Sequence, residues 1–347
     1  MHSRPIRLAA KLAATALVGS VVALSAPAAQ AAPVFVDADT AVDGFAGAST
    51  DSGACVTNPT TANTSAVPIL ENGAAATTSP SVTATSANGG DTALLAATST
   101  ATGSVKSAGG NPSAMDFTTS GTASADFALP ASGCSLETYS GSDLYFTFVV
   151  TTPGFLHLDF KSKGSFYSEV YLYNTPQPSD YPYYEHYGRG LNFAGKDTVY
   201  LPAGSYSGYF EGYVQLTSNV DKTVTGTTSV HATFSTAGAT TAAPTGKASK
   251  YVGLGARTCA THAVNASVTS AKKAAKKIKT IKFFVNGAVA KSVKKPKKGA
   301  AVVIPVADDQ AAEVTAEVTL LPKKKKGKKA KPGKVYEVSA AYEACTS

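Results

Sequence analysis

Lysine runs are the residues whose type and spacing most clearly suggest chemistry in this chain. They fall into three short segments within residues 247–347: Lys272, Lys273, Lys276, Lys277, Lys294, Lys295, Lys297, Lys298, Lys323, Lys324, Lys325, Lys326, Lys328, Lys329 and Lys331. A lysine ammonium attracts phosphate or carboxylate as a point charge, whereas arginine, which suits bidentate contacts, occurs there only at Arg257. The pattern predicts unspecific attraction to an anionic polymer such as wall polymer, lipid headgroups or nucleic acid, without readout of a base sequence. The competing interpretation is solvated surface that only promotes solubility.

A tyrosine-rich segment, residues 175–190, is the second candidate site. Its three prolines and two glycines are typical of an ordered surface loop. Tyrosine offers a flat face with a polar tip at low entropic cost, which suits contact with a sugar or a protein. The candidate ligand residues are Tyr181, Tyr183, Tyr184, His186, Tyr187 and Arg189. The alternative is that these rings cover the edge of the fold, and the absence of tryptophan lowers the case for carbohydrate.

Motifs for catalysis or metal binding are weak. His157 and Asp159 share one face of a predicted strand, but no serine partner is indicated. We find no glycine-rich phosphate loop and no paired general acid and base, so we expect no enzyme, no cofactor and no metal site. A loose likeness to a calcium loop lacks the spacing and terminal glutamate of an EF-hand; it involves Asp37, Asp39 and Asp43.

Charge divides the chain into two halves. The 347 residues carry a net charge of +8, and the length favours two domains. Residues 32–246 hold 6 Lys and Arg against 17 Asp and Glu, a net charge of −11, whereas residues 247–347 hold 22 against 6, a net charge of +16. The boundary predicted from a Gly/Ala/Thr/Pro-rich stretch is a linker over residues 237–250. Only 16% of residues are charged, which excludes charge-driven disorder and a coiled coil.

The first residues have the pattern of a secretory signal. Arg4, Arg7 and Lys11 precede an apolar stretch at residues 12–24, which is too short to span a bilayer comfortably. Residues 29–31 fit a small-x-small cleavage site, so residues 1–31 are predicted to be removed. The alternative is an uncleaved anchor. We expect an extracellular, secreted protein without a transmembrane anchor, either released or held non-covalently at the cell wall.

Export would place the four cysteines in an oxidising compartment. They are Cys55, Cys134, Cys259 and Cys345, and three pairings are open. We predict Cys55–Cys134 and Cys259–Cys345, because each pair brackets one half of the chain. Zinc binding is disfavoured because the spacings contain no CxxC motif and no nearby histidine pair.

The fold class predicted from periodicity is all-β. In residues 143–235, apolar side chains alternate with polar ones between Gly and Pro breaks, as at Leu144, Phe146 and Phe148. Residues 80–128 alternate more weakly among small side chains, so we expect them to pair with the aromatic strands. Residues 32–236 are therefore interpreted as one sandwich, with two small domains as the alternative.

Two resemblances refine this expectation. Residues 146–160, FTFVVTTPGFLHLDF, and 199–206, VYLPAGSY, resemble the jelly-roll modules of secreted bacterial proteins, above all the pre-peptidase C-terminal type. That likeness implies an accessory binding sandwich and carries over no catalytic residue. Residues 281–287, IKFFVNG, are similar to Ig-like repeats of bacterial surface proteins. The resemblances therefore imply a jelly-roll-like β-sandwich followed, at residues 251–347, by an Ig-like one.

Strand counting places the lysine runs together. The predicted strands of the second half are 261–269, 278–285, 288–293, 300–306, 312–321 and 334–343, and Asn286-Gly287 is a strong hairpin signal. If successive strands run up and down, the lysine runs occupy the first, third and fifth connections, which lie at one end. Cys259 and Cys345 then lie at the other end. The function we expect is non-catalytic binding at a bacterial surface, with part of an extracellular hydrolase as the alternative.

Overall fold

The structure is a computed structural model of the whole chain. It describes residues 33–48, 56–57, 60–63, 66–79, 81–88, 91–127, 136–164, 166–175, 183–189, 192–218, 220–306, 309–322 and 331–346. The predicted signal, residues 1–31, and the predicted Cys55–Cys134 pair lie outside these residues. The described residues are mostly antiparallel strands that form sandwich modules, so the all-β prediction is confirmed.

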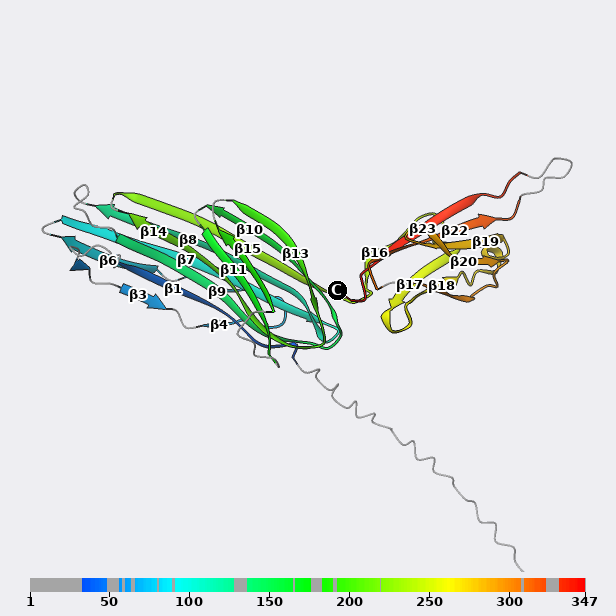
Figure 1. Cartoon of the computed structure of the whole chain (residues 1–347), viewed down its shortest axis with the longest axis horizontal. Coiled ribbons are helices and arrows are strands. Elements are labelled where there is room, and N and C mark those ends of the chain that lie inside the picture. Colours follow the sequence, from blue (N-terminus) through cyan, green and yellow to red (C-terminus); the bar gives the residue numbers. More distant parts are fainter. Residues whose placement is uncertain are drawn as a thin grey trace, which may run out of the picture. The chain divides into compact units, whose positions relative to one another are not determined.

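The first module consists of two sheets of long strands, blue to green in Figure 1. Sheet A has the order β12 (Tyr184–Arg189), β11 (Phe166–Asn174), β14 (Gly204–Ser218), β9 (Leu136–Val150), β1 (Phe35–Ala48), β3 (Thr60–Asn63), and β4 (Val67–Pro68) pairs with β1. Sheet B has the order β13 (Phe193–Leu201), β10 (Gly154–Gly164), β15 (Lys222–Thr236), β8 (Asn111–Phe127), β7 (Asp91–Ala108), β6 (Ser81–Asn88), β2 (Val56–Thr57), and β5 (Ala76–Thr78) pairs with β7.

The core of the first module is aromatic where β9 and β14 face sheet B. Successive side chains of a strand point to opposite faces, so Phe146 and Phe148 of β9 both face inward and are buried. The Phe146 ring packs edge-on against Phe210 of β14 at 4.9 Å between centroids. Phe117 of β8 lies opposite Val230 of β15, and both belong to this core. Of the strands with small side chains, β8 pairs with β15 as expected, whereas β7 pairs with β8 and β6.

The second module, yellow to red in Figure 1, has its own sheets and its own core. Sheet C has the order β16 (Thr240–Thr245), β23 (Val335–Tyr342), β22 (Ala312–Leu320), β19 (Ile278–Val285), β20 (Ala288–Lys294). Sheet D has the order β17 (Val252–Thr258), β18 (Ala263–Val268), β21 (Ala301–Pro305). The helical segments are short: η1 (Cys259–Thr261) and α1 (Lys272–Ala275). Ile281, Phe283, Val314 and Val318 are fully buried between the sheets.

The predicted linker is not simply a linker. Within residues 237–250, β16 pairs antiparallel with β23, where Thr240 lies opposite Tyr342. The chain then turns, and β17 runs back beside β18. Sequence analysis missed both strands. Ala, Thr and Pro in β16 show no apolar alternation, and in β17 only Val252 and Leu254 alternate, with glycines after each. All six strands predicted for the second half are present, with bounds that differ by at most two residues.

Two buried tyrosines make the fold sensitive to high pH. Burial raises the pKa of Tyr206, and that of Tyr342, from 10.0 to about 12. Their hydroxyls donate to backbone carbonyls, Tyr206 to Pro202 at 2.9 Å and Tyr342 to Gly255 at 2.8 Å. A raised pKa of the folded state means that the neutral phenol is favoured on folding. The associated stability is complete below pH 10 and is lost as pH rises towards 12.

We therefore expect the free energy of unfolding to fall between about pH 10 and 12, by about 2 to 3 kcal/mol for each phenol. Tyr206→Phe should lower the free energy of unfolding by about 1 kcal/mol at neutral pH, because the hydrogen bond is lost. It should also remove the part of the fall at alkaline pH that comes from Tyr206. Denaturant titrations of both proteins at neutral and alkaline pH measure this. Equal alkaline losses in the two proteins would contradict the assignment to Tyr206.

Candidate functional site

The lysine-bearing connections of the second module meet at one end. The backbone N–H of Leu321 donates to the carbonyl of Lys277 at 2.7 Å, which joins the connection after β22 to the connection after β18. The N–H of Gly299 donates to the carbonyl of Thr269 at 3.3 Å, which brings in the connection after β20. The structure thus brings together the backbones that sequence counting placed together. Lys323 to Lys329 lie outside the described residues.

A fourth connection, residues 246–251, lies at the same end and was missed by sequence analysis. The N–H of Thr269 donates to the carbonyl of Tyr251 at 2.9 Å. The Tyr251 ring stacks on that of Tyr336 at 6.0 Å, and the Lys250 ammonium lies 5.3 and 5.0 Å from the two ring centroids. This is a cation–π arrangement. Only the pairing of β16 with β23, which the sequence did not reveal, places Lys250 here.

We call the exposed lysines of these four connections the lysine pole. Its described members are Lys247, Lys250, Lys272, Lys273, Lys276, Lys277, Lys294, Lys295, Lys297, Lys298, Lys331 and Lys334. No Asp or Glu occurs in residues 246–251, 269–277, 294–300 or 320–334. Mutual repulsion of these ammonium groups is therefore not neutralised within the connections. A polyanion at this end would relieve the repulsion, and the ammonium groups would attract it over several ångströms.

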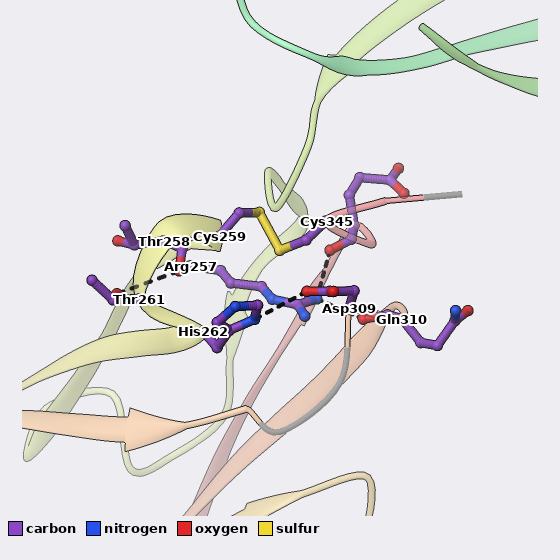
Figure 2. The surroundings of a disulfide bond; sticks show 9 residues. Arg257, Thr258, Cys259, Thr261, His262, Asp309, Gln310 and Cys345 are labelled. Atoms are coloured by element: carbon purple, nitrogen blue, oxygen red, sulfur yellow. Dashed lines mark hydrogen bonds and ion pairs between the residues drawn. A yellow bond between two sulfur atoms is a disulfide. The ribbon is translucent and has the colours of Figure 1, made fainter. Parts of the chain in front are cut away.

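The opposite end of the second module is tied by the disulfide between Cys259 and Cys345, as predicted (Figure 2). Beside it, the buried Arg257 donates through Nη1 to the carbonyls of Gln310, at 2.6 Å, and Glu343, at 2.8 Å. These bonds attach two segments to β17: the residues just before β22 and the residues just after β23. This end carries the disulfide and the side-chain hydrogen bonds of Arg257, whereas backbone hydrogen bonds join the connections of the opposite, lysine-bearing end.

The predicted tyrosine-rich loop is partly a strand. Residues Tyr184–Arg189 form β12, the edge strand of sheet A, because they pair with β11. The Tyr184 hydroxyl donates to Asp197 Oδ2 at 2.9 Å, and the Tyr183 hydroxyl donates to the Tyr200 carbonyl at 2.8 Å. Burial, followed by the hydrogen bond to Asp197, raises the pKa of Tyr184 well above its usual range. These contacts favour rings that cover the sandwich edge.

The other candidate residues of that segment are Tyr181, His186, Tyr187 and Arg189. Tyr181 lies outside the described residues. The other members are described only through the backbone of β12: His186 lies opposite Val170, Tyr187 opposite Glu169 and Arg189 opposite Tyr167.

A tyrosine surface that sequence analysis missed lies on the outer face of sheet A. Because Phe146, Phe148, Val170, Leu172, Phe210 and Val214 point inward, the residues between them on the same strands point outward. We call this surface the tyrosine face; it consists of Tyr145, Tyr167, Tyr171, Tyr173, Tyr209 and Tyr213. Ring centroids of the cross-strand pairs lie 4.6 Å apart for Tyr167–Tyr213 and 4.8 Å for Tyr171–Tyr209.

A row of carboxylates crosses the middle of the tyrosine face. Glu169 of β11 lies directly opposite Glu211 of β14, and Glu211 lies opposite Asp143 of β9. Carboxylates directly opposite one another on neighbouring strands repel and destabilise the sheet. In the described part of the chain, no group of three or more His, Cys, Asp or Glu side chains is arranged to hold a metal ion.

Sheet B has a shallow groove on its outer face, with a volume of about 530 Å³. Its walls carry the hydroxyls of Thr100, Ser120 and Thr227 beside Lys163, and glycines form part of its floor. At Gly121 a Cβ atom would lie 3.0 Å from the Val214 side chain of sheet A, so glycine lets the sheets approach closely here. The hydroxyls and the Lys163 ammonium of the groove can form hydrogen bonds with a polyhydroxylated ligand.

For the candidate catalytic residue His157, the structure supplies a serine neighbour that the sequence did not indicate. His157 Nε2 lies 2.9 Å from Ser235 Oγ, but its Nδ1 lies 3.2 Å from Thr198 Oγ1, a hydroxyl where a triad would hold a carboxylate. The calcium-like aspartates Asp37, Asp39 and Asp43 lie in β1, a strand paired with β9, and not in a loop. Among the described residues, no helix is long and apolar enough to cross a membrane.

Comparisons with known proteins do not assign a family. No protein-family model matches the chain. No curated protein matches it either. The crystal structure of the adhesin domain of Epf from Streptococcus pyogenes is similar over 58% of this chain and 75% of that one, with 11% identity and a TM-score of 0.19. At that TM-score the likeness carries no argument about this chain.

Proposed function

We propose that this chain is a secreted, non-catalytic binding protein of the bacterial cell surface whose lysine pole contacts an anionic polymer. The observation that carries the proposal is the convergence of four connections, all without Asp or Glu, at one end of the second module. Lysine without arginine suits a polymer of repeated phosphates or carboxylates, because point charges need no fixed geometry. The ligand we infer is anionic cell-wall polymer.

Strand order supports the module types implied by the resemblances. In the first module, β8-β15-β10-β13 lie opposite β9-β14-β11-β12. Apart from the hairpin of β11 and β12, successive strands from β8 to β15 alternate between the two sheets in the manner of a jelly roll. In the second, β23-β22-β19-β20 lie opposite β17-β18-β21, which corresponds to the GFCC′ and ABE strand sets of an Ig-like sandwich. Both architectures occur in binding modules, and both place their loops at the ends of the sandwich.

The experiment is co-sedimentation of the chain from Ala32 with purified cell walls, either intact or chemically stripped of anionic polymer. We expect sedimentation with intact walls in low salt, release by added salt, and little binding to stripped walls. Equal binding to both wall preparations would overturn the proposal. Release of soluble sugar or peptide from the walls would instead favour the alternative of an extracellular hydrolase.

A further inference from the structure

The tyrosine face and the lysine pole have complementary chemistry. The face belongs to the half of the chain with net charge −11, and the pole belongs to the half with net charge +16. The row formed by Glu169, Glu211 and Asp143 lies between the tyrosine pair Tyr171–Tyr209 and the pair Tyr167–Tyr213. Across three strands this row spans about 10 Å, which suits several ammonium groups on one connection better than a single ion.

One lysine of the pole already contacts tyrosine rings within the chain. The Lys250 ammonium lies over the stacked rings of Tyr251 and Tyr336, about as far from each centroid as a cation–π contact requires. The tyrosine face offers paired rings of the same kind, with cross-strand centroid distances of 4.6 and 4.8 Å, and adds carboxylates. A lysine-rich connection could therefore contact both rings and carboxylates there.

The pole is placed to reach another molecule. The chain enters the second module at Thr240, opposite Tyr342, which is the end tied by the Cys259–Cys345 disulfide. The pole lies at the other end of the strands, about 25 Å away for strands of this length. It is therefore presented at the end of the module that faces away from the chain entry.

We propose that the lysine pole of one molecule docks on the tyrosine face of a second copy of this chain. The two surfaces differ, so a pair of bound molecules still has one unoccupied lysine pole and one unoccupied tyrosine face. Repetition of the contact therefore builds open head-to-tail chains. The inference shares the pole with the proposed function but does not need a wall polymer. Soluble polyanion should compete with docking because it occupies the same lysines.

The first test is sedimentation velocity of the chain from Ala32 over a wide concentration range at about 0.02 M and about 0.5 M salt. We expect the average sedimentation coefficient to rise with concentration only in low salt, and added polyanion to reverse the rise. A monomer at every concentration in low salt would overturn the proposal, while leaving polyanion binding to be measured on its own.

Isosteric neutralisation tests the face. The variant Glu169→Gln/Glu211→Gln/Asp143→Asn should weaken self-association by about tenfold, because three charge pairs with the pole are removed. It should bind polyanion as the unaltered chain does. The matched control removes three exposed carboxylates elsewhere on the first module: Asp116→Asn/Asp126→Asn/Asp221→Asn. Equal weakening by both variants would show that only net charge matters and would overturn docking at the face.

Charge exchange tests the pairing of the two surfaces. One variant carries Glu169→Lys/Glu211→Lys on the face, and a second carries Lys294→Glu/Lys295→Glu/Lys297→Glu/Lys298→Glu on the pole. Each alone should remain monomeric because like charges meet, whereas the mixture should associate because both interfaces are attractive again. Circular dichroism of each variant checks that it folds. No association in a mixture of two folded variants would overturn the proposal.

Discussion

Binding of polyanion to the chain from Ala32 should fall steeply with salt. A protein that contacts 6 to 10 phosphates of duplex DNA loses about 10³- to 10⁵-fold in affinity between about 50 and 200 mM salt, because condensed counterions are released on binding. The lysine pole presents a comparable set of exposed lysines in four connections. Fluorescence anisotropy with short DNA duplexes, used as polyanions of known charge density, measures the slope. Two duplexes of unrelated sequence should bind equally, because lysine contacts to phosphate carry no base information.

The connection after β20 offers a clean variant for this prediction. Neutralising Lys294, Lys295, Lys297 and Lys298 to glutamine should lower affinity and reduce the salt slope by about 1 for each lysine–phosphate pair removed. The matched control neutralises four lysines outside the pole, Lys163, Lys222, Lys282 and Lys291. It should leave the slope nearly unchanged. We also expect neutralisation of residues 323–329 to matter disproportionately, since they hold six of the predicted lysines.

Two outcomes would contradict the prediction. If the chain is not retained by a polyanion column at about 0.02 M salt, where screening is weak, the lysines serve only solubility. If binding survives at about 1 M salt, charge is not its cause, because the Debye length is then only about 3 Å. The tyrosine face would then be the better candidate for the contact.

Loss of the Cys259–Cys345 disulfide should strongly destabilise the second module. The bridge joins residues separated by 86 positions. Loop-closure entropy of that size corresponds to about 4 to 5 kcal/mol. For a module of roughly a hundred residues this corresponds to a fall in melting temperature of about 20 °C or more. The cross-link also holds the segment after β23 near Arg257, whose hydrogen bonds depend on that placement.

Native-state hydrogen exchange of Cys259→Ser/Cys345→Ser measures this loss module by module. Amides of β22 and β23 should exchange about 10³-fold faster, in line with the lost stability, while those of β9 and β14 should be unaffected. Unchanged protection in β22 and β23 would contradict the prediction. Peptide mapping without reduction tests the Cys55–Cys134 prediction at the same time, and a bridge between the halves would contradict both pairings.

Strand periodicity explains why so much of the fold was predictable. Leu144, Phe146 and Phe148 alternate with outward residues in β9, and this two-residue period is a property of the strand itself. The same holds for Ile281 and Phe283 in β19. Where period two is weak, the prediction is wrong or incomplete: the sequence predicts a linker at β16 and a loop at β12, because Thr, Pro, Tyr and charged residues fill both faces. Only pairing with β23 and β11 makes these segments strands.

Three of the four connections of the lysine pole were predictable, and the tyrosine face was not. Lysines gather at one end because alternate connections of antiparallel strands necessarily do so, which strand counting alone reveals. Tyr171, Tyr209 and Tyr145 come from three strands, and their adjacency depends on the register of β11 with β14 and of β14 with β9. A shift of one residue would turn each of them to the other face.

By itself, the sequence determined many of the strands, although not β12, β16 or β17, and the opposite charges of the two halves. It also predicted that three lysine-bearing connections of the second module lie at one end. These follow from local periodicity and from the order of elements along the chain. Only the tertiary structure decided which strands are neighbours, and with that the tyrosine face, its carboxylate row and the position of Lys250 over Tyr251 and Tyr336. The physical reason is that pairing register is set by the burial of both sheets against one another, a contact between residues far apart in the chain.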